Sequence, residues 1–182
     1  MPTRICILPM TIPVAKETIT LTVQDDSQFA LRAVTDADLE KLRQWKNEQH
    51  EFFFYKDEIT PEQQRNWYAA FQLRPHDFMF MAVLYGQSIG CMGIRWLDNV
   101  WDVYNVILGR PEFGGRGFMG KAFNTMLAYA LSVKELPITL QVLKHNPAVN
   151  WYLKNGFVIT VKHDDHFSMI YQSNNNQQEG TP

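Results

Sequence analysis

The sequence is poor in cysteine, in long apolar runs and in surplus charge, and each shortage excludes a class of protein. Cys6 and Cys91 are the only two cysteines, which indicates reduced thiols rather than a disulfide framework. No apolar run approaches the roughly 20 residues that a membrane-spanning helix needs. The short apolar stretch Ile5–Pro9 lacks the cleavage pattern of a signal peptide. We therefore expect a cytoplasmic protein with no membrane partner.

The chain also lacks a cationic surplus and a recognisable metal-binding pattern. Lysine and arginine total 17 and aspartate and glutamate 19, so the formal net charge is −2. Binding to a phosphate backbone requires a basic surface, so nucleic acid is not an expected partner. His163 and His166 flank an Asp-Asp pair, but no third ligand follows at a recognised spacing, and we predict no metal site.

What the chain does have is enough apolar sequence for one domain of about 140 residues. Hydrophobic residues make up 46% and charged residues 20% of the 182 residues. The β-rich segments Ile5–Leu8 and Thr18–Val23 predict an N-terminal extension, residues 1–28, that contributes an extra strand or a hairpin. Residues 29–172 form the predicted domain, and the polar residues 173–182 are read as a disordered tail.

Seven strands and four helices are predicted in this domain. A helix over residues 36–47 follows from the spacing of Leu39, Leu42 and Trp45. Thr60-Pro61-Glu62-Gln63 has the capping-box pattern of a second helix start, and Asn146-Pro147 starts a short fourth helix that ends at Gly156. The predicted strands span residues 29–34, 78–85, 88–96, 101–108, 138–143, 157–161 and 167–171.

A glycine cluster lies between a predicted strand and the longest amphipathic helix of the chain. It reads Gly114-Gly115-Arg116-Gly117-Phe118-Met119-Gly120. Glycines allow the backbone to approach a ligand, and the first N–H groups of a helix have no intrahelical acceptor, so the cluster suits a pyrophosphate. A loop that only reverses the chain is the alternative. A P-loop is excluded because no Gly-Lys-Ser/Thr follows, and a Rossmann site is disfavoured because the preceding strands look antiparallel.

Two segments together resemble the GNAT superfamily of acyl-CoA-dependent N-acyltransferases. The glycine cluster is similar to the family's Arg/Gln-x-x-Gly-x-Gly/Ala turn, with Gly114 in place of the Arg/Gln and Met119 in place of the second small residue. Residues 146–157 are similar to the family's Asn-x-x-Ala-x-x-x-Tyr-x-x-x-Gly-Phe helix, although Asn146 lies one residue closer to the tyrosine. The form of the cluster is closest to the branch of ribosomal-protein N-terminal and nucleotide-amino-sugar acetyltransferases.

The resemblance implies a fold, a cofactor site and a site for the acceptor. The fold is one α/β (α+β) domain with a mixed, mostly antiparallel sheet of about seven strands that separates near Leu108–Arg110 to admit the cofactor. Acetyl-CoA is the implied co-substrate, bound by Ile107, Leu108, Gly109, Gly115, Arg116, Gly117, Phe118, Met119, Gly120 and Asn146. The acceptor would contact Trp45, Phe53, Tyr55 and Trp67. For both tryptophans, a purely structural role in the core is the alternative.

The resemblance also places Tyr152 as the general acid that protonates the departing thiolate, with packing as the alternative role. A strand N–H near Leu108 or Gly109 would polarise the thioester carbonyl. The general base stays open among Asp102, Glu112, Glu51, His50 and solvent. Asp102 would serve only if a bulge changes the direction of its side chain.

We therefore expect an acetyl-CoA-dependent N-acetyltransferase that acts on a primary amine of a small molecule, with a nucleotide-linked amino sugar as the leading acceptor. A protein N-terminal amine or another small amine is the alternative of the same class. A non-catalytic acyl-CoA-binding module is the alternative of another class. The sequence leaves open whether the chain forms a homodimer.

Overall fold

The computed structural model describes residues 16–24 and 26–172. The strand expected at Ile5–Leu8 and the tail expected at residues 173–182 lie outside the described residues. Within the described part of the chain, no helix has the length and apolar character needed to cross a bilayer.

One mixed sheet of eight strands runs through the molecule, in the order β1-β2-β3-β4-β5-β6-β8-β7. All neighbouring strands are antiparallel except β5 and β6. The eighth strand is β1, which lies within the segment Thr18–Val23 where an extra strand or a hairpin was expected, and it pairs with β2. The strands are β1 (Thr20–Val23), β2 (Asp26–Ala33), β3 (Asp77–Leu84), β4 (Gln87–Leu97), β5 (Val100–Leu108), β6 (Ile138–Leu143), β7 (Phe157–Lys162) and β8 (His166–Tyr171).

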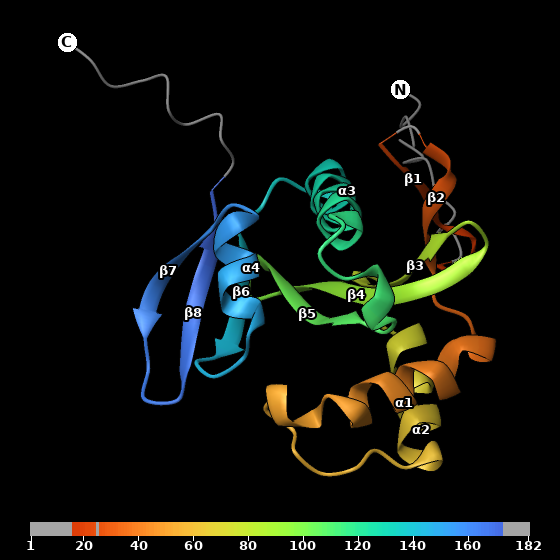
Figure 1. Cartoon of the computed structure of the whole chain (residues 1–182), viewed down its shortest axis with the longest axis horizontal. Helices are drawn as coiled ribbons and strands as arrows, with labels where there is room; N and C mark the ends of the chain where they lie inside the picture. Colours follow the sequence, from red (N-terminus) through yellow and green to blue (C-terminus); the bar gives the residue numbers. More distant parts are fainter. Residues whose placement is uncertain (1–15, 25, 173–182) are drawn as a thin grey trace, which may run out of the picture.

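Four helices cover the two faces of this sheet. They are α1 (Leu39–Glu48), α2 (Pro61–Gln72), α3 (Phe118–Val133) and α4 (Ala148–Lys154). The helices α3 and α4 lie on one face, and α1 and α2 lie on the other (Figure 1). Short 3-10 helices also occur at Lys16–Thr18, Asp36–Asp38, His50–Phe52 and Pro111–Phe113.

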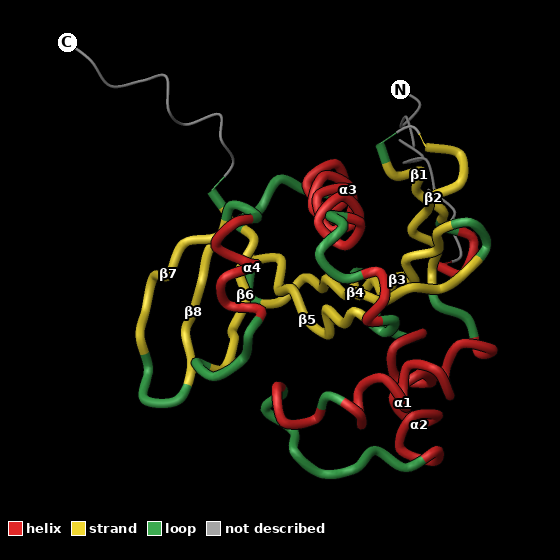
Figure 2. The backbone as a smooth tube through the Cα atoms, in the orientation of Figure 1, coloured by secondary structure: helices red, strands yellow, loops and turns green. Residues whose placement is uncertain are grey.

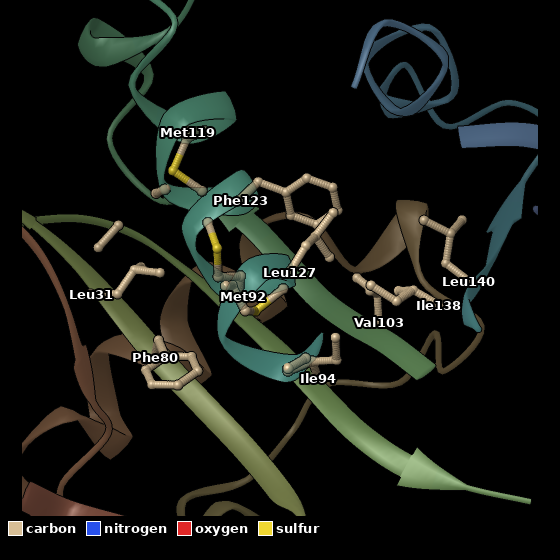
Figure 3. Close-up of a cluster of buried hydrophobic side chains, with 14 of the residues drawn as sticks. Leu31, Phe80, Met92, Ile94, Val103, Met119, Phe123, Leu127, Ile138 and Leu140 are labelled. Carbon is tan, nitrogen blue, oxygen red and sulfur yellow. The ribbon is translucent and has the colours of Figure 1, made fainter. Parts of the chain in front are cut away.

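The core consists of two buried clusters, one on each face of the sheet. Phe123 and Leu127 of α3 pack on strand residues such as Met92 and Ile94 in the larger cluster (Figure 3). The smaller cluster lies under α1 and α2 and includes Trp45, which is 7% exposed. Because burial occurs on both faces, β3 and β4 are apolar on both sides, which explains their continuous apolar sequence.

The predicted helix starts are present, with one small difference. The Thr60 hydroxyl accepts the Gln63 N–H at 3.2 Å, and the Gln63 side chain accepts the Thr60 N–H at 2.8 Å. The Asn146 side chain accepts the Ala148 N–H at 2.8 Å, but the helix begins at Ala148 and Pro147 takes the N-cap position. Gly156 ends this helix with a φ of +87°, a value that glycine adopts without strain.

The two parallel strands separate earlier than the sequence indicated. β5 and β6 pair only at Trp101 with Ile138 and at Asp102 with Thr139, so the gap opens from residue 103 and not near residue 108. The cause is a bulge in β5: Tyr104 faces Gly93 and Ile107 faces Cys91, which leaves an extra residue on β5. Asn105 has a φ of +48° there, and such a bulge bends its strand away from the regular sheet.

Candidate functional site

The glycine cluster forms one wall of a cavity of about 440 Å³ at the start of α3. We call it the glycine-loop cavity. It gathers seven of the residues predicted to bind the cofactor, namely Leu108, Gly115, Gly117, Phe118, Met119, Gly120 and Asn146. The remaining lining residues are Gln49, Phe52, Phe53, Val106, Phe113, Gly114, Pro147, Ala148 and Trp151.

This cavity fits an anionic group through its backbone rather than through side chains. At the start of α3, the Lys121 N–H donates a hydrogen bond of 3.1 Å to the Gly117 carbonyl. The N–H groups that precede Lys121 in the helix therefore have no intrahelical acceptor. Gly115 and Gly117 have φ values of +69° and +77°, and a Cβ added to either would meet no atom within 4 Å. The open backbone and the positive end of the helix dipole both favour a pyrophosphate.

Three residues predicted for the cofactor do not line this cavity. The Ile107 side chain is buried on the opposite face of the sheet. Gly109 packs directly against the Trp45 ring, where an added Cβ would overlap the indole. Arg116 is exposed, and its guanidinium carbon lies 5.0 Å from the Phe118 ring centroid, beside the cavity rather than in its wall.

Two adjoining hollows of about 350 and 390 Å³ lie beside β5. The first is lined from α1 and α2, and the second extends across the gap to β6 and α4. They share Lys46, Tyr55, Trp67 and Asn105, and we call them together the aromatic cavity. Much of one wall comes from the segment between α1 and α2, which Figure 2 shows as a short helix followed by a loop. Of the four residues predicted to contact the acceptor, Phe53, Tyr55 and Trp67 line this cavity and Trp45 does not.

The bulge in β5 introduces residues that the sequence did not single out. Asn105 faces α1, where its side-chain oxygen accepts a hydrogen bond of 2.6 Å from the Lys46 Nζ. The same Nζ lies 4.9 Å from the Phe53 ring centroid. An isolated asparagine in an apolar strand was the available signal, because asparagine tolerates a positive φ better than most residues.

The two cavities meet at four residues. Phe52, Phe53, Val106 and Asn146 line both the glycine-loop cavity and the aromatic cavity. The Asn146 side chain donates a hydrogen bond of 3.1 Å to the Phe52 carbonyl and so joins the start of α4 to the segment after α1. A ligand in one cavity therefore has direct access to a ligand in the other.

Backbone donors of β5 point into the gap beside this junction. The Trp101 N–H donates to the Pro137 carbonyl at 2.8 Å, on the β6 side. The Gly109 N–H donates to the Ile89 carbonyl at 3.0 Å, on the β4 side, and is therefore not available to a ligand. N–H directions alternate along a strand, so the Val106 and Leu108 N–H groups face the gap after the bulge.

Tyr152 lines the aromatic cavity from α4 and is 8% exposed. Its ring contacts the rings of Phe123, Trp151 and Phe157, and its hydroxyl has no hydrogen-bond partner among the described residues. Burial raises the pKa of Tyr152 well above that of a free tyrosine, so the phenol is protonated at neutral pH. A fixed phenol of this kind can donate a proton or a hydrogen bond.

Asp102 is the one carboxylate that lines either cavity in the described residues. It accepts hydrogen bonds from Arg95, whose Nε lies 2.9 Å away. Burial raises the pKa of Asp102, and this effect outweighs the opposing effect of Arg95. The other candidate bases, Glu112, Glu51 and His50, do not line the cavities.

No group of three or more histidine, cysteine, aspartate or glutamate side chains suited to a metal occurs within residues 16–24 and 26–172. His163 and His166 instead stack on each other, and their ring centroids are 4.1 Å apart.

Comparisons with known proteins find one matching family and several solved structures of the same fold. The sequence profile of the family described as "Acetyltransferase (GNAT) domain" matches residues 28–158. A search of curated protein sequences finds no significant match.

Solved structures of low sequence identity share the fold. A domain from Methanocaldococcus jannaschii superposes with a TM-score of 0.70 at 18% identity, over 80% of this chain and 98% of that one. A ribosomal-protein alpha-N-acetyltransferase in complex with coenzyme A gives a TM-score of 0.68 at 12% identity, over 85% and 97% of the two chains. Spermidine N-acetyltransferase from Vibrio cholerae, with coenzyme A and spermine, gives 0.68 at 22% identity, over 80% and 95%.

Proposed function

The chain belongs to the GNAT acetyltransferase family and is an acetyl-CoA-dependent N-acetyltransferase, and on this premise we propose that its acceptor is the primary amine of a small molecule, with a nucleotide-linked amino sugar as the leading candidate. The observation that carries the proposal is the junction of the two cavities at Phe52, Phe53, Val106 and Asn146. Acetyl-CoA would occupy the glycine-loop cavity and the acceptor the aromatic cavity.

The donor side of the reaction uses the backbone. The pyrophosphate of CoA would bind the free N–H groups of residues 115–120, and the pantetheine would run along the gap between β5 and β6 as an added strand. The Val106 N–H lies at the junction and faces the gap, so we assign it the role of polarising the thioester carbonyl. Coenzyme A supplies the activated acetyl group, and the protein orients it toward the amine.

The reaction needs one group that takes a proton from the amine and another that gives a proton to the departing thiolate. The amine nitrogen bonds to the acetyl carbon, the carbon–sulfur bond breaks, and the amine loses a proton. We assign Asp102 as the group that accepts the proton of the amine. We assign Tyr152 as the group that donates a proton to the departing thiolate. Both residues line the aromatic cavity. Burial raises the pKa of Tyr152, but a thiolate in the same cavity is desolvated as well, which keeps the proton transfer feasible.

The walls of the aromatic cavity favour a ring-shaped acceptor. Phe53, Tyr55 and Trp67 present aromatic surfaces on which a sugar or a nucleotide base can stack. Tyr55 is 46% exposed and belongs to the segment after α1, so it is free to contact a ligand that enters from solvent.

A turnover assay with a panel of amines tests this proposal. Acetyl-CoA is combined with a nucleotide-linked amino sugar, a free amino sugar, spermidine and a short peptide with a free N-terminus, and free CoA is measured. We expect the highest kcat/KM for the nucleotide-linked amino sugar. A higher kcat/KM for the peptide or for spermidine would contradict the proposed acceptor. The absence of turnover with any amine would favour a non-catalytic binding module.

A variant in the cavity wall locates the acceptor in the same assay. Tyr55→Ala should raise the acceptor KM severalfold and leave the affinity for acetyl-CoA unchanged, because Tyr55 lines only the aromatic cavity. Tyr85→Ala is the matched control, since Tyr85 is a 65% exposed tyrosine in the turn between β3 and β4. Equal losses for both substrates would assign Tyr55 a structural role.

A further inference from the structure

Lys46 is a partly buried cation without a carboxylate partner. Its Nζ donates to Asn105 Oδ1 and lies over the Phe53 ring, and it forms no ion pair within the described residues. The ionisable groups that act on the pKa of Lys46 are Cys91 and Arg95, and Arg95 has the same charge as Lys46. Burial raises the pKa of Cys91 to about 12, so this thiol is neutral and supplies no counter-charge.

An uncompensated ammonium in such a place is costly, since a charge removed from water is stabilised only by opposite charge or by hydrogen bonds. One of its three N–H donors is used by Asn105. The others remain for the aromatic cavity, whose two hollows both have Lys46 in their walls. Burial lowers the pKa of Lys46, as expected for a cation that lacks its counter-ion.

Gln64 supplies a second polar side chain without a partner in the wall of this hollow. Its side chain is only 8% exposed and lines the same hollow as Lys46. It has no hydrogen-bond partner among the described residues, although Gln63, its neighbour, uses its own amide in the cap of α2. The Gln64 amide is therefore available to hydrogen-bond a polar ligand that also reaches Lys46 in this hollow.

We propose that Lys46 and Gln64 form an anion subsite that binds a phosphate or carboxylate group of the acceptor, while the acceptor's amine lies at the junction with the glycine-loop cavity. This inference rests on the proposed function and narrows it to anionic primary amines.

The charges of the cavity wall agree with this subsite. The charged side chains that line the aromatic cavity are Lys46, Arg95 and Asp102, and the last two pair with each other at 2.9 Å. Lys46 therefore leaves one unpaired positive charge in the wall, which attracts an anion and repels a polycation. The subsite thus disfavours a polyamine such as spermidine as acceptor.

Calorimetry with matched amine pairs tests the subsite on the CoA-loaded enzyme. Glucosamine 6-phosphate is compared with glucosamine, and β-alanine with β-alaninamide, so that each pair isolates one anionic group. We expect at least one anionic member to bind about 10- to 100-fold more tightly than its neutral counterpart, the usual worth of a charge-assisted hydrogen bond. The amine pair with the larger difference in affinity identifies phosphate or carboxylate as the anionic group of the acceptor.

Variants assign that preference to named side chains. Lys46→Met should abolish it and change binding of the neutral amine less than threefold, whereas Lys46→Arg should retain most of it. Gln64→Met should weaken it. Lys41→Met, which removes an exposed lysine from the same helix, is the control and should change nothing.

Two outcomes overturn the subsite: no tenfold preference in either pair, or a preference that survives in Lys46→Met. The first needs only the parent protein and so does not depend on how a variant folds. Transfer is followed separately by CoA release. An anionic amine that binds through Lys46 but is never acetylated contradicts the proposed function alone, and acetylation without any charge preference contradicts the subsite alone.

Discussion

Burial shifts the pKa values of Tyr152 and Asp102 in the same direction but prepares them for opposite tasks. A raised pKa keeps the Tyr152 phenol protonated, so it remains a donor. The same shift makes the Asp102 carboxylate a stronger proton acceptor than an exposed aspartate. A single physical cause thus fits both roles that the reaction requires.

Removal of the hydroxyl group of Tyr152 tests its role as proton donor. Tyr152→Phe keeps the ring contacts with Phe123 and Phe157, so the fold and the affinity for acetyl-CoA should survive. The single-turnover rate should fall about 10²- to 10⁴-fold, the usual contribution of a general acid. The loss should shrink with an acyl donor whose thiol is more acidic.

Tyr129→Phe is the matched control, because Tyr129 is a half-buried tyrosine that packs on Phe78 and Phe80 and lines neither cavity. A near-parent rate in Tyr152→Phe, or a loss that ignores thiol acidity, would reduce Tyr152 to a packing role.

The pH dependence of the rate tests Asp102. A base works when deprotonated, so kcat/KM should fall as the pH drops through the pKa of Asp102. That pKa is raised, so the fall should occur above pH 3.8, the value of an ordinary aspartate. Asp102→Asn should lower the rate about 10²- to 10⁴-fold and remove this acidic limb.

Arg95→Gln supplies the complementary change. Arg95 lowers the pKa of Asp102, so its removal should move the acidic limb to higher pH. An acidic limb that stays in place in both variants belongs to another group, and Asp102 would then have only a structural role.

Adjacent residues of α1 illustrate why single positions were hard to assign from the sequence. Trp45 was expected in the acceptor site, yet it packs on Gly109, while Lys46 lines the cavity. Neighbouring side chains on a helix point about 100° apart, so an error of one position changes the face. Which face meets the cavity depends on how α1 packs on the sheet, and the local sequence does not contain that information.

At the scale of elements, the glycine turn before α3 is the proposed binding site of acetyl-CoA. Gly117→Val places a branched side chain at a φ of +77°, in the open space where the backbone should approach CoA. We expect the affinity for CoA to fall at least tenfold by calorimetry.

Gly86→Val is the control for strain alone. Gly86 has a similar φ of +75° and equally open surroundings, but it lies in the turn between β3 and β4, outside the glycine-loop cavity. Equal CoA affinity in folded Gly117→Val and in the parent would show that the turn does not hold the ligand.

The glycine turn and the α4 motif were predictable because each depends on local backbone chemistry. The gap between β5 and β6 was placed several residues too late, because the bulge at Asn105 results from the pairing of β5 with β4. An asparagine in a strand does not by itself reveal such a shift. Likewise Lys46, Gln64 and Asn105 come from three elements, and their meeting is a property of the packed fold.

At the scale of the whole molecule, the proposed acetyl-CoA site joins distant parts of the chain. The glycine-loop cavity takes residues from β5, α3 and α4 and from the segment after α1, so a bound ligand contacts segments far apart in the sequence. Acetyl-CoA at 100 times its dissociation constant should stabilise the fold by about 2.7 kcal/mol. This corresponds to a rise in Tm of about 5–10 °C for a chain of this size. A Tm that does not depend on acetyl-CoA concentration would contradict specific binding.

The short pairing of β5 with β6 has a consequence for amide hydrogen exchange. From Val103 onward the N–H groups on the β6 side of β5 have no partner strand, although they lie inside a continuous sheet. In the free enzyme the Val106 and Leu108 amides should therefore exchange with deuterium much faster than that of Gly109, which is bonded to Ile89. Acetyl-CoA should slow their exchange and leave that of Gly109 unchanged, so that the exchange rates of these three amides report directly on whether the pantetheine completes the sheet.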